Sequence, residues 1–117
     1  MDIKEYIKQA QRTTAELGDR FTDEMHYTLG IVTEAGELAD VYKKHIAYGR
    51  KMDYVNVSEE IGDLMWYVAN LCRVLDIDFD KMLDTNIAKL RARYPEKFDE
   101  EHANNRNLEI ERAILEK

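Results

Sequence analysis

Four acidic residues, arranged in two pairs, have the spacing of a divalent metal site. Glu34 and Glu37 form the first pair, and Glu60 and Asp63 follow after a spacer of 22 residues. A three-residue spacing places both acids of a pair on one face of a helix, about 5–6 Å apart at Cβ. Two such helices packed at about 8–10 Å bring four carboxylates together, and such a cluster repels itself unless a cation lies within it. We therefore predict that all four residues bind metal.

The ligand type indicates which metal and which chemistry. Carboxylate oxygens without a pair of nearby His or Cys ligands favour Mg²⁺, with Mn²⁺ as a substitute. Because Mg²⁺ keeps several waters and typically holds substrate phosphates, we expect metal-assisted attack of water on a phosphorus. A carboxylate that the metal does not fully use could take the proton of this water, and Glu37 is our candidate for that catalytic role.

The surroundings of the acids carry more weight than their spacing, because 24 of the 117 residues are acidic. Eight of the fourteen residues in 29–42 are apolar, and so are eleven of the fifteen in 61–75. An uncompensated carboxylate in an apolar setting is strongly unfavourable, which favours a bound cation. The alternative is a solvated acidic stripe.

Further side chains on the same helix faces are candidates for substrate binding. Lys44 lies two turns after Glu37, and Asn70 continues the stripe of the second acidic pair. His26 precedes the first pair by two turns, and Trp66 has the ring to stack on a base. The alternative is a structural role for His26 and a core or interface role for Trp66.

An amide and two cations share one face of a later helix. Asn86, Lys89 and Arg93 follow the spacing i, i+3, i+7, and together they could hold a polyphosphate. The alternative for this basic face is plain solvated surface.

The elements that position these residues are expected to be helical throughout, because the chain has one proline and few alternating β-branched runs. Gly18 and Gly49 are the expected breaks. Asn56 is the expected N-cap of the third helix, and Ser58 is the competing cap. Asp78 is the expected N-cap of the fourth helix, which stops before Pro95. The expected helices cover residues 2–17, 22–46 and 57–75, followed by a fourth between Asp78 and Tyr94-Pro95 and a short stretch at 108–115.

Two glycines inside the expected helices suggest close packing. Residues 33–38 and 59–64 share a pattern of acid, any residue, glycine, acid and leucine, which predicts two similar helices facing each other. Glycine within a helix costs about 1 kcal/mol relative to alanine. We therefore expect close backbone approach at Gly36 and Gly62.

Composition limits the class of protein. The length fits one domain, 1–117, with a core at about 20–95 and a polar tail at 96–117. A net charge of −7 argues against binding nucleic-acid polymers through a basic surface. A single cysteine, Cys72, suits the reducing cytoplasm. We see no signal peptide, and no apolar run reaches the ~18 residues that span a bilayer.

The apolar character of residues 61–75 predicts self-association. This segment is apolar on nearly all sides, and one helix of a small bundle buries only part of its surface. Met65 and Trp66 would leave an unusual exposed patch on a monomer. The expected fold is an all-α, four-helix bundle-type core that assembles as a homodimer or a dimer of dimers.

The order and spacing of the acidic pairs resemble those of the MazG-like nucleotide pyrophosphohydrolases, in the all-α nucleoside triphosphate pyrophosphatase superfamily. The resemblance covers about residues 20–106 and is closest to the short bacterial and phage forms. The matching parts are His26, residues 34–40, Tyr48-Gly49, residues 59–67 and residues 86–95. The family's first motif often begins with two adjacent acids, whereas Thr33 takes the first place here.

The resemblance implies hydrolysis of a nucleoside or deoxynucleoside triphosphate to the monophosphate and pyrophosphate. It also implies Mg²⁺ held by the two acidic pairs, and a site completed by oligomerisation. Phosphoribosyl-ATP pyrophosphohydrolase is a related alternative, but that family tends to carry a histidine where this chain has Tyr67. A non-enzymatic carboxylate-rich bundle that binds metal or a partner is the other alternative, although it has no need of the basic face.

Overall fold

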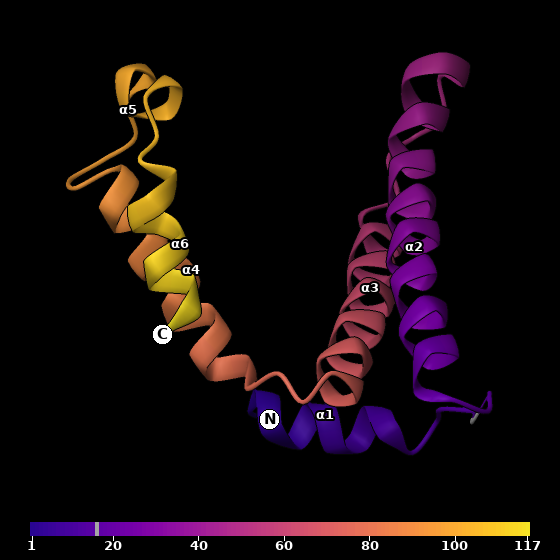
Figure 1. The fold of residues 1–117 in the computed structure, drawn as a ribbon. Helices are drawn as coiled ribbons and strands as arrows, with labels where there is room; N and C mark the ends of the chain where they lie inside the picture. Colours follow the sequence, from indigo (N-terminus) through magenta and orange to yellow (C-terminus); the bar gives the residue numbers. More distant parts are fainter. Residues whose placement is uncertain (16) are drawn as a thin grey trace. The chain divides into compact units, whose positions relative to one another are not determined.

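The computed structural model describes residues 1–15 and 17–117, and every regular element in these ranges is an α-helix (Figure 1). The all-α prediction is therefore confirmed. The chain forms two compact units, Met1–Ile77 and Asp78–Lys117. No described helix combines the length and apolarity needed to cross a membrane. The helices are α1 (Ile3–Gln11), α2 (Arg20–Tyr48) and α3 (Tyr54–Val74) in the first unit, and α4 (Phe79–Arg93), α5 (Glu100–Asn104) and α6 (Leu108–Glu116) in the second.

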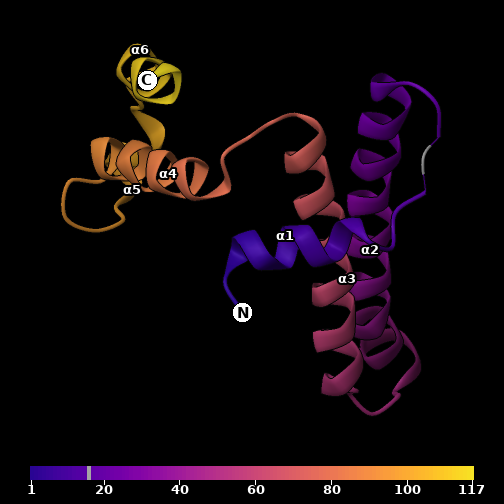
Figure 2. The same cartoon turned by 90° about the horizontal axis from the view of Figure 1, so that it is seen from below.

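A hairpin of two long helices, α2 and α3, forms the centre of the first unit. They lie side by side in both views of the ribbon (Figures 1 and 2) and contact each other along their length. Gly49 ends α2 in the left-handed conformation, with φ 65°, and its N–H donates to the carbonyl of His45. The predicted break at Gly49 and the predicted pairing of the two acidic helices are both confirmed.

The close approach between α2 and α3 occurs at Gly30. The ring of Tyr67 occupies the space that a Cβ at Gly30 would need. A Cβ at Gly36 or at Gly62 would meet nothing within 4 Å among the described residues. The prediction of close approach at Gly36 and Gly62 is therefore wrong. The helix faces that carry these two glycines point away from the α2–α3 contact.

The first helix is shorter than predicted. The sequence suggested a helix over residues 2–17, but α1 ends at Gln11 and residue 16 lies outside the described residues. The hydroxyls of Thr13 and Thr14 donate to the carbonyls of Ala10 and Gln11, respectively. Such local bonds offer the backbone an alternative to continuing the helix.

Two aspartates set helix starts that the sequence analysis placed later. Asp19 caps α2, which begins at Arg20 rather than at residue 22. Asp53 caps α3, and its carboxylate accepts from the backbone N–H of Asn56 at 3.1 Å. The predicted cap at Asn56 and its competitor Ser58 are therefore wrong, because an equally good cap three residues earlier lets the helix begin sooner.

The C-terminal unit consists of α4 and α6 packed together, with the short α5 between them in sequence. Asp78 caps α4 as predicted, and the helix ends at Arg93, before Pro95. The short α5, capped by Asp99, was not anticipated. Since α4 belongs to this separate unit, the single domain and the four-helix core stay predictions.

A buried ion-pair cluster joins α4 to α6. Glu111 is 3% exposed, and its carboxylate accepts from Arg93 at 2.6 Å and from Arg106 at 3.0 Å. Hydrogen bonds from these two guanidinium groups lower the pKa of Glu111 from 4.5 to about 2, and the bond from Arg106 has the larger effect. The C-terminal unit therefore holds a fully compensated acid at its centre.

Substitution of Gly30 tests the close approach. In Gly30→Ala the new methyl overlaps the Tyr67 ring, so we expect a loss of about 1–3 kcal/mol in the free energy of unfolding from overpacking. Gly36→Ala, at an exposed helical position, should instead gain up to about 1 kcal/mol from helix propensity. Chemical denaturation followed by circular dichroism measures both. Equal effects of the two substitutions would contradict the close approach at Gly30.

The Glu111 cluster predicts a pH-dependent contribution to stability. Because the folded pKa lies below the ordinary value, ionised Glu111 stabilises the fold above pH 4.5, and this stabilisation is lost as the pH falls towards about 2. Glu111→Gln should therefore have a lower melting temperature than the wild type at pH 7. This difference in melting temperature should decrease as the pH falls from 4.5 towards about 2. Glu116→Gln, in an exposed pair of the same helix, is the control and should change little. A gap that does not depend on pH would refute the ion-pair account.

Candidate metal centre and active site

Three of the four predicted metal ligands meet between α2 and α3. One oxygen from each of Glu34, Glu60 and Asp63 lies within 4.8 Å of the other two. Glu60 is buried, Glu34 is half-buried and Asp63 is exposed, so the group extends from the helix interface to the surface. We refer to these three residues as the carboxylate cluster.

The electrostatics of the carboxylate cluster favour a cation. Burial raises the pKa of Glu60 above its ordinary range, and a hydrogen bond and the charge of Glu34 raise it further. Asp63 and Glu37 act in the same direction. A hard divalent cation would relieve both the burial and the repulsion, and three carboxylates are a ligand set that suits Mg²⁺.

Glu37, the predicted fourth ligand and candidate base, lies outside this closest group. Its side chain is exposed and lines a pocket of about 280 Å³ together with Lys44, Arg50 and Lys51. Lys44 is an ion-pair partner of Asp40 at 2.8 Å. Arg50 and Lys51 were not among the residues predicted from the sequence, although two cations directly after the helix-ending Gly49 were a usable signal.

An aromatic group lies beside the carboxylate cluster and includes two predicted substrate contacts. His26 meets Tyr67 edge to face, with ring centroids 6.0 Å apart. Trp66 meets Tyr67 at 5.0 Å, and its Nε1–H donates to the Thr13 hydroxyl at 2.9 Å. The buried Nδ1 of His26 has no hydrogen-bond partner among the described residues. The ring of Tyr67 thus links His26 and Trp66.

Asn70, another predicted contact, is fully buried rather than open to solvent. Its amide donates to the carbonyl of Trp66 at 3.1 Å, and its side-chain oxygen accepts from Nε of Arg73 at 3.2 Å. Both interactions are internal to the first unit, and Asn70 contacts the backbone of its own helix and the side chain of Arg73.

The three predicted residues of the basic face belong to α4 in the C-terminal unit. Asn86 is exposed and Lys89 is half-buried. Arg93 is engaged with Glu111 and lies over the Tyr94 ring, 5.6 Å from its centroid. The structure therefore gives Arg93 a carboxylate partner that the sequence spacing did not indicate.

Comparison with known proteins decides the family. The MazG nucleotide pyrophosphohydrolase domain matches residues 22–98, which include the carboxylate cluster and the whole of α4. The chain belongs to this family. The resemblance inferred from the two acidic pairs is thereby confirmed.

A phage protein is similar to part of the chain. The gene 37 protein of Mycobacterium phage L5 is 39% identical over 75 residues, which cover 58% of this chain and 63% of the phage protein. The chain thus spans less than two thirds of the length of this curated relative. No solved structure matches the chain. A phage relative agrees with the resemblance to short bacterial and phage forms of MazG.

The raised pKa of Glu60 predicts that metal-free protein is destabilised by its own cluster. Because the folded chain holds this proton more tightly than the unfolded chain, stability falls as the pH rises from 4.5 through the raised value. Glu60→Gln should therefore melt above the wild type at pH 7 in chelator, and Mg²⁺ should no longer raise its melting temperature.

The matched control is Glu59→Gln, the loss of an exposed acid one residue away, which should keep the wild-type response to Mg²⁺. Thermal unfolding by circular dichroism, with and without Mg²⁺, provides the measurement. Equal stabilisation of Glu60→Gln and wild type by Mg²⁺ would rule out Glu60 as a ligand.

Proposed function

We propose that the protein is an Mg²⁺-dependent nucleotide pyrophosphohydrolase, with Mn²⁺ as a substitute metal. It would convert a nucleoside or deoxynucleoside triphosphate and water into the monophosphate and pyrophosphate, in the cytoplasm. The observation that carries this proposal is the carboxylate cluster, a hard-oxygen ligand set in a chain of the MazG family. Membership of the family alone would not identify which residues react.

The proposed reaction is attack of water on the α-phosphorus, with pyrophosphate as the leaving group. The metal, when bound by Glu34, Glu60 and Asp63, supplies neutralisation of phosphate oxygens and polarisation of the water. Glu37 lies outside the closest three carboxylates and is exposed, which leaves its oxygens available to accept the proton of the water. Glu37 also remains a candidate fourth ligand.

The proposed substrate contacts fall into two groups. Lys44 from α2 and Lys89 from α4 would neutralise phosphate oxygens, and Asn86 would donate to them through its amide. Arg93, which is paired with Glu111, would contribute its remaining N–H donors. His26 and Trp66 would contact the nucleoside, supported by their ring contacts with Tyr67 beside the carboxylates. Asn70 would act as a positioning residue, because its buried side-chain oxygen accepts from the guanidinium of Arg73.

Turnover of a panel of nucleoside and deoxynucleoside triphosphates tests the proposal. With Mg²⁺ present, ion-exchange separation should show a monophosphate and pyrophosphate as products. Glu34→Gln and Asp63→Asn should each lower kcat/KM by about 100-fold or more, since even the supporting partners of metal ligands typically account for 10–100-fold.

Glu59→Gln is again the matched control and should retain wild-type turnover. Circular dichroism checks that each variant keeps its helices. Turnover that survives chelation would refute the metal mechanism, and no turnover of any nucleotide with bound Mg²⁺ would favour the non-enzymatic metal-binding bundle.

We further propose that a second copy of the chain covers an apolar stripe on α2. The stripe follows helical spacing on the face opposite the carboxylates, and its large side chains are 47–66% exposed. The predicted interface residues Met65 and Trp66 are instead half-buried, because α1 packs on α3 within the same chain. The stripe consists of Phe21, Met25, Leu29 and Val32, and it continues with the small residues Ala35, Gly36 and Ala39.

A charge placed on this stripe should prevent self-association. We expect the wild type to scatter light as a dimer or a tetramer at micromolar concentration, and Val32→Asp to scatter as a monomer, because the substitution buries an unpaired charge at the interface. Val55→Asp makes the same change at an exposed position of α3 and should leave the assembly intact. A monodisperse wild-type monomer of about 14 kDa would overturn the proposal.

A further inference from the structure

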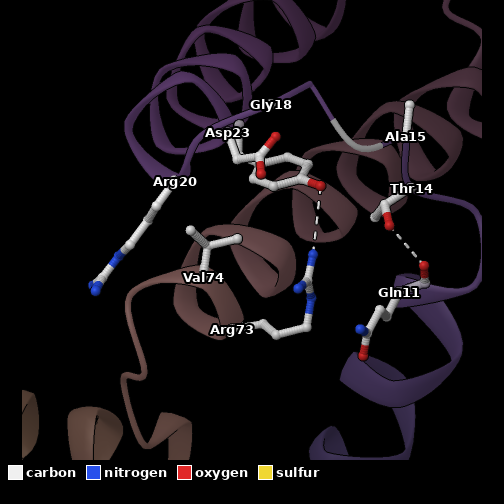
Figure 3. A pocket seen from close by; sticks show the side chains of 9 residues that line it. Gln11, Thr14, Ala15, Gly18, Arg20, Asp23, Arg73 and Val74 are labelled. Carbon is white, nitrogen blue, oxygen red and sulfur yellow. Dashed lines mark hydrogen bonds between the residues drawn. The ribbon is translucent and has the colours of Figure 1, made fainter.

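A second pocket lies in the first unit, away from the carboxylate cluster. Its volume is about 430 Å³, and it opens between the segment that follows α1, the first turns of α2 and the end of α3 (Figure 3). Asp23 precedes Glu34 by 11 residues on α2, which is about 16 Å along a helix. Arg73 follows Asp63 by 10 residues on α3, or about 15 Å. The pocket is therefore distinct from the candidate metal centre.

The guanidinium of Arg73 is fixed in this pocket by neutral groups. Its Nε donates to the side-chain oxygen of Asn70 at 3.2 Å, and a terminal nitrogen donates to the Tyr27 hydroxyl at 3.4 Å (Figure 3 draws this second bond). Asn70 is 0% exposed and Tyr27 is 1% exposed, so both anchors are rigid. The cation is thus held in one orientation before any ligand arrives.

No carboxylate of the described residues forms an ion pair with Arg73, whereas Arg93 has such a partner. Arg73 and Arg93 are both half-buried, whereas the other described arginines are exposed. Arg93 is paired with Glu111, but no described carboxylate lies within 4.0 Å of Arg73. Arg20 at the pocket rim is itself paired with Glu24. A positioned cation with unused N–H donors is the arrangement that binds oxyanions.

We propose that this pocket binds a small oxyanion, a carboxylate or a phosphate monoester, through the guanidinium of Arg73. Tyr27 accepts a bond from Arg73, so its own O–H remains a donor for the ligand, and the side-chain amide of Gln11 supplies another donor. The carboxylate of Asp23 also lines the pocket, and its repulsion selects against triphosphates. The site does not depend on the proposed hydrolase activity.

Nuclear magnetic resonance of the arginine side chains tests this site in the metal-free full-length protein. The Nε–H signal of Arg73 is assigned by its absence in Arg73→Lys. Titration with inorganic phosphate and, separately, with acetate should shift this signal in a saturable way. The anion that saturates the shift at the lower concentration is the preferred oxyanion. Pyrophosphate should shift it less, because Asp23 repels the extra charge.

Two variants separate the pocket from general charge effects. Ala15→Trp fills the pocket from its rim without altering Arg73 and should abolish the shift. Arg12→Gln removes an exposed positive charge from the end of α1 and should leave the titration unchanged. A signal that neither anion moves in the folded wild type, or that moves equally in Ala15→Trp, would overturn the proposal.

Discussion

The contact of the Tyr67 ring with Gly30 sets how closely α2 and α3 approach. Gly30 lies one turn before Glu34, and Tyr67 lies one turn after Asp63, so the contact is directly beside the acids. One turn from this contact, one oxygen from each member of the carboxylate cluster lies within 4.8 Å of the other two. Packing of a ring on a glycine thus holds together groups whose charges repel. The remaining features of the candidate active site depend on that geometry.

Three buried or half-buried charged side chains of this chain lie in different electrostatic environments. Glu111 is compensated by two guanidinium groups, which lower its pKa. Glu60 is surrounded by other acids, and its pKa is raised. Arg73 is fixed by neutral side chains. Among residues 1–15 and 17–117, only the first arrangement pairs opposite charges, and an unpaired buried charge is costly. The other two arrangements favour binding of a cation and of an anion, respectively.

Segments outside the family domain support residues inside it. The MazG match begins at residue 22 and ends at residue 98, so it includes neither α1 nor α6. The segment after α1 supplies Thr13, which accepts from the indole of Trp66. Helix α6 supplies Glu111, which holds Arg93. The flanking segments therefore contact two side chains that we propose as substrate contacts.

The sequence by itself determined the all-helical class, the break at Gly49, the extent of α4 and the pairing of two acidic helices. The first three features depend on local spacing, capping and backbone conformation, which a single segment contains. The pairing followed from the acidic pattern that residues 33–38 and 59–64 share. Tertiary structure decided that Gly30 rather than Gly36 is the close contact, that Glu37 lies outside the closest carboxylates, and that Asn70 is buried. These outcomes depend on the rotation of each helix about its axis when it packs. An i, i+3 spacing shows which residues share a face, whereas only the partner helix determines which of them it meets.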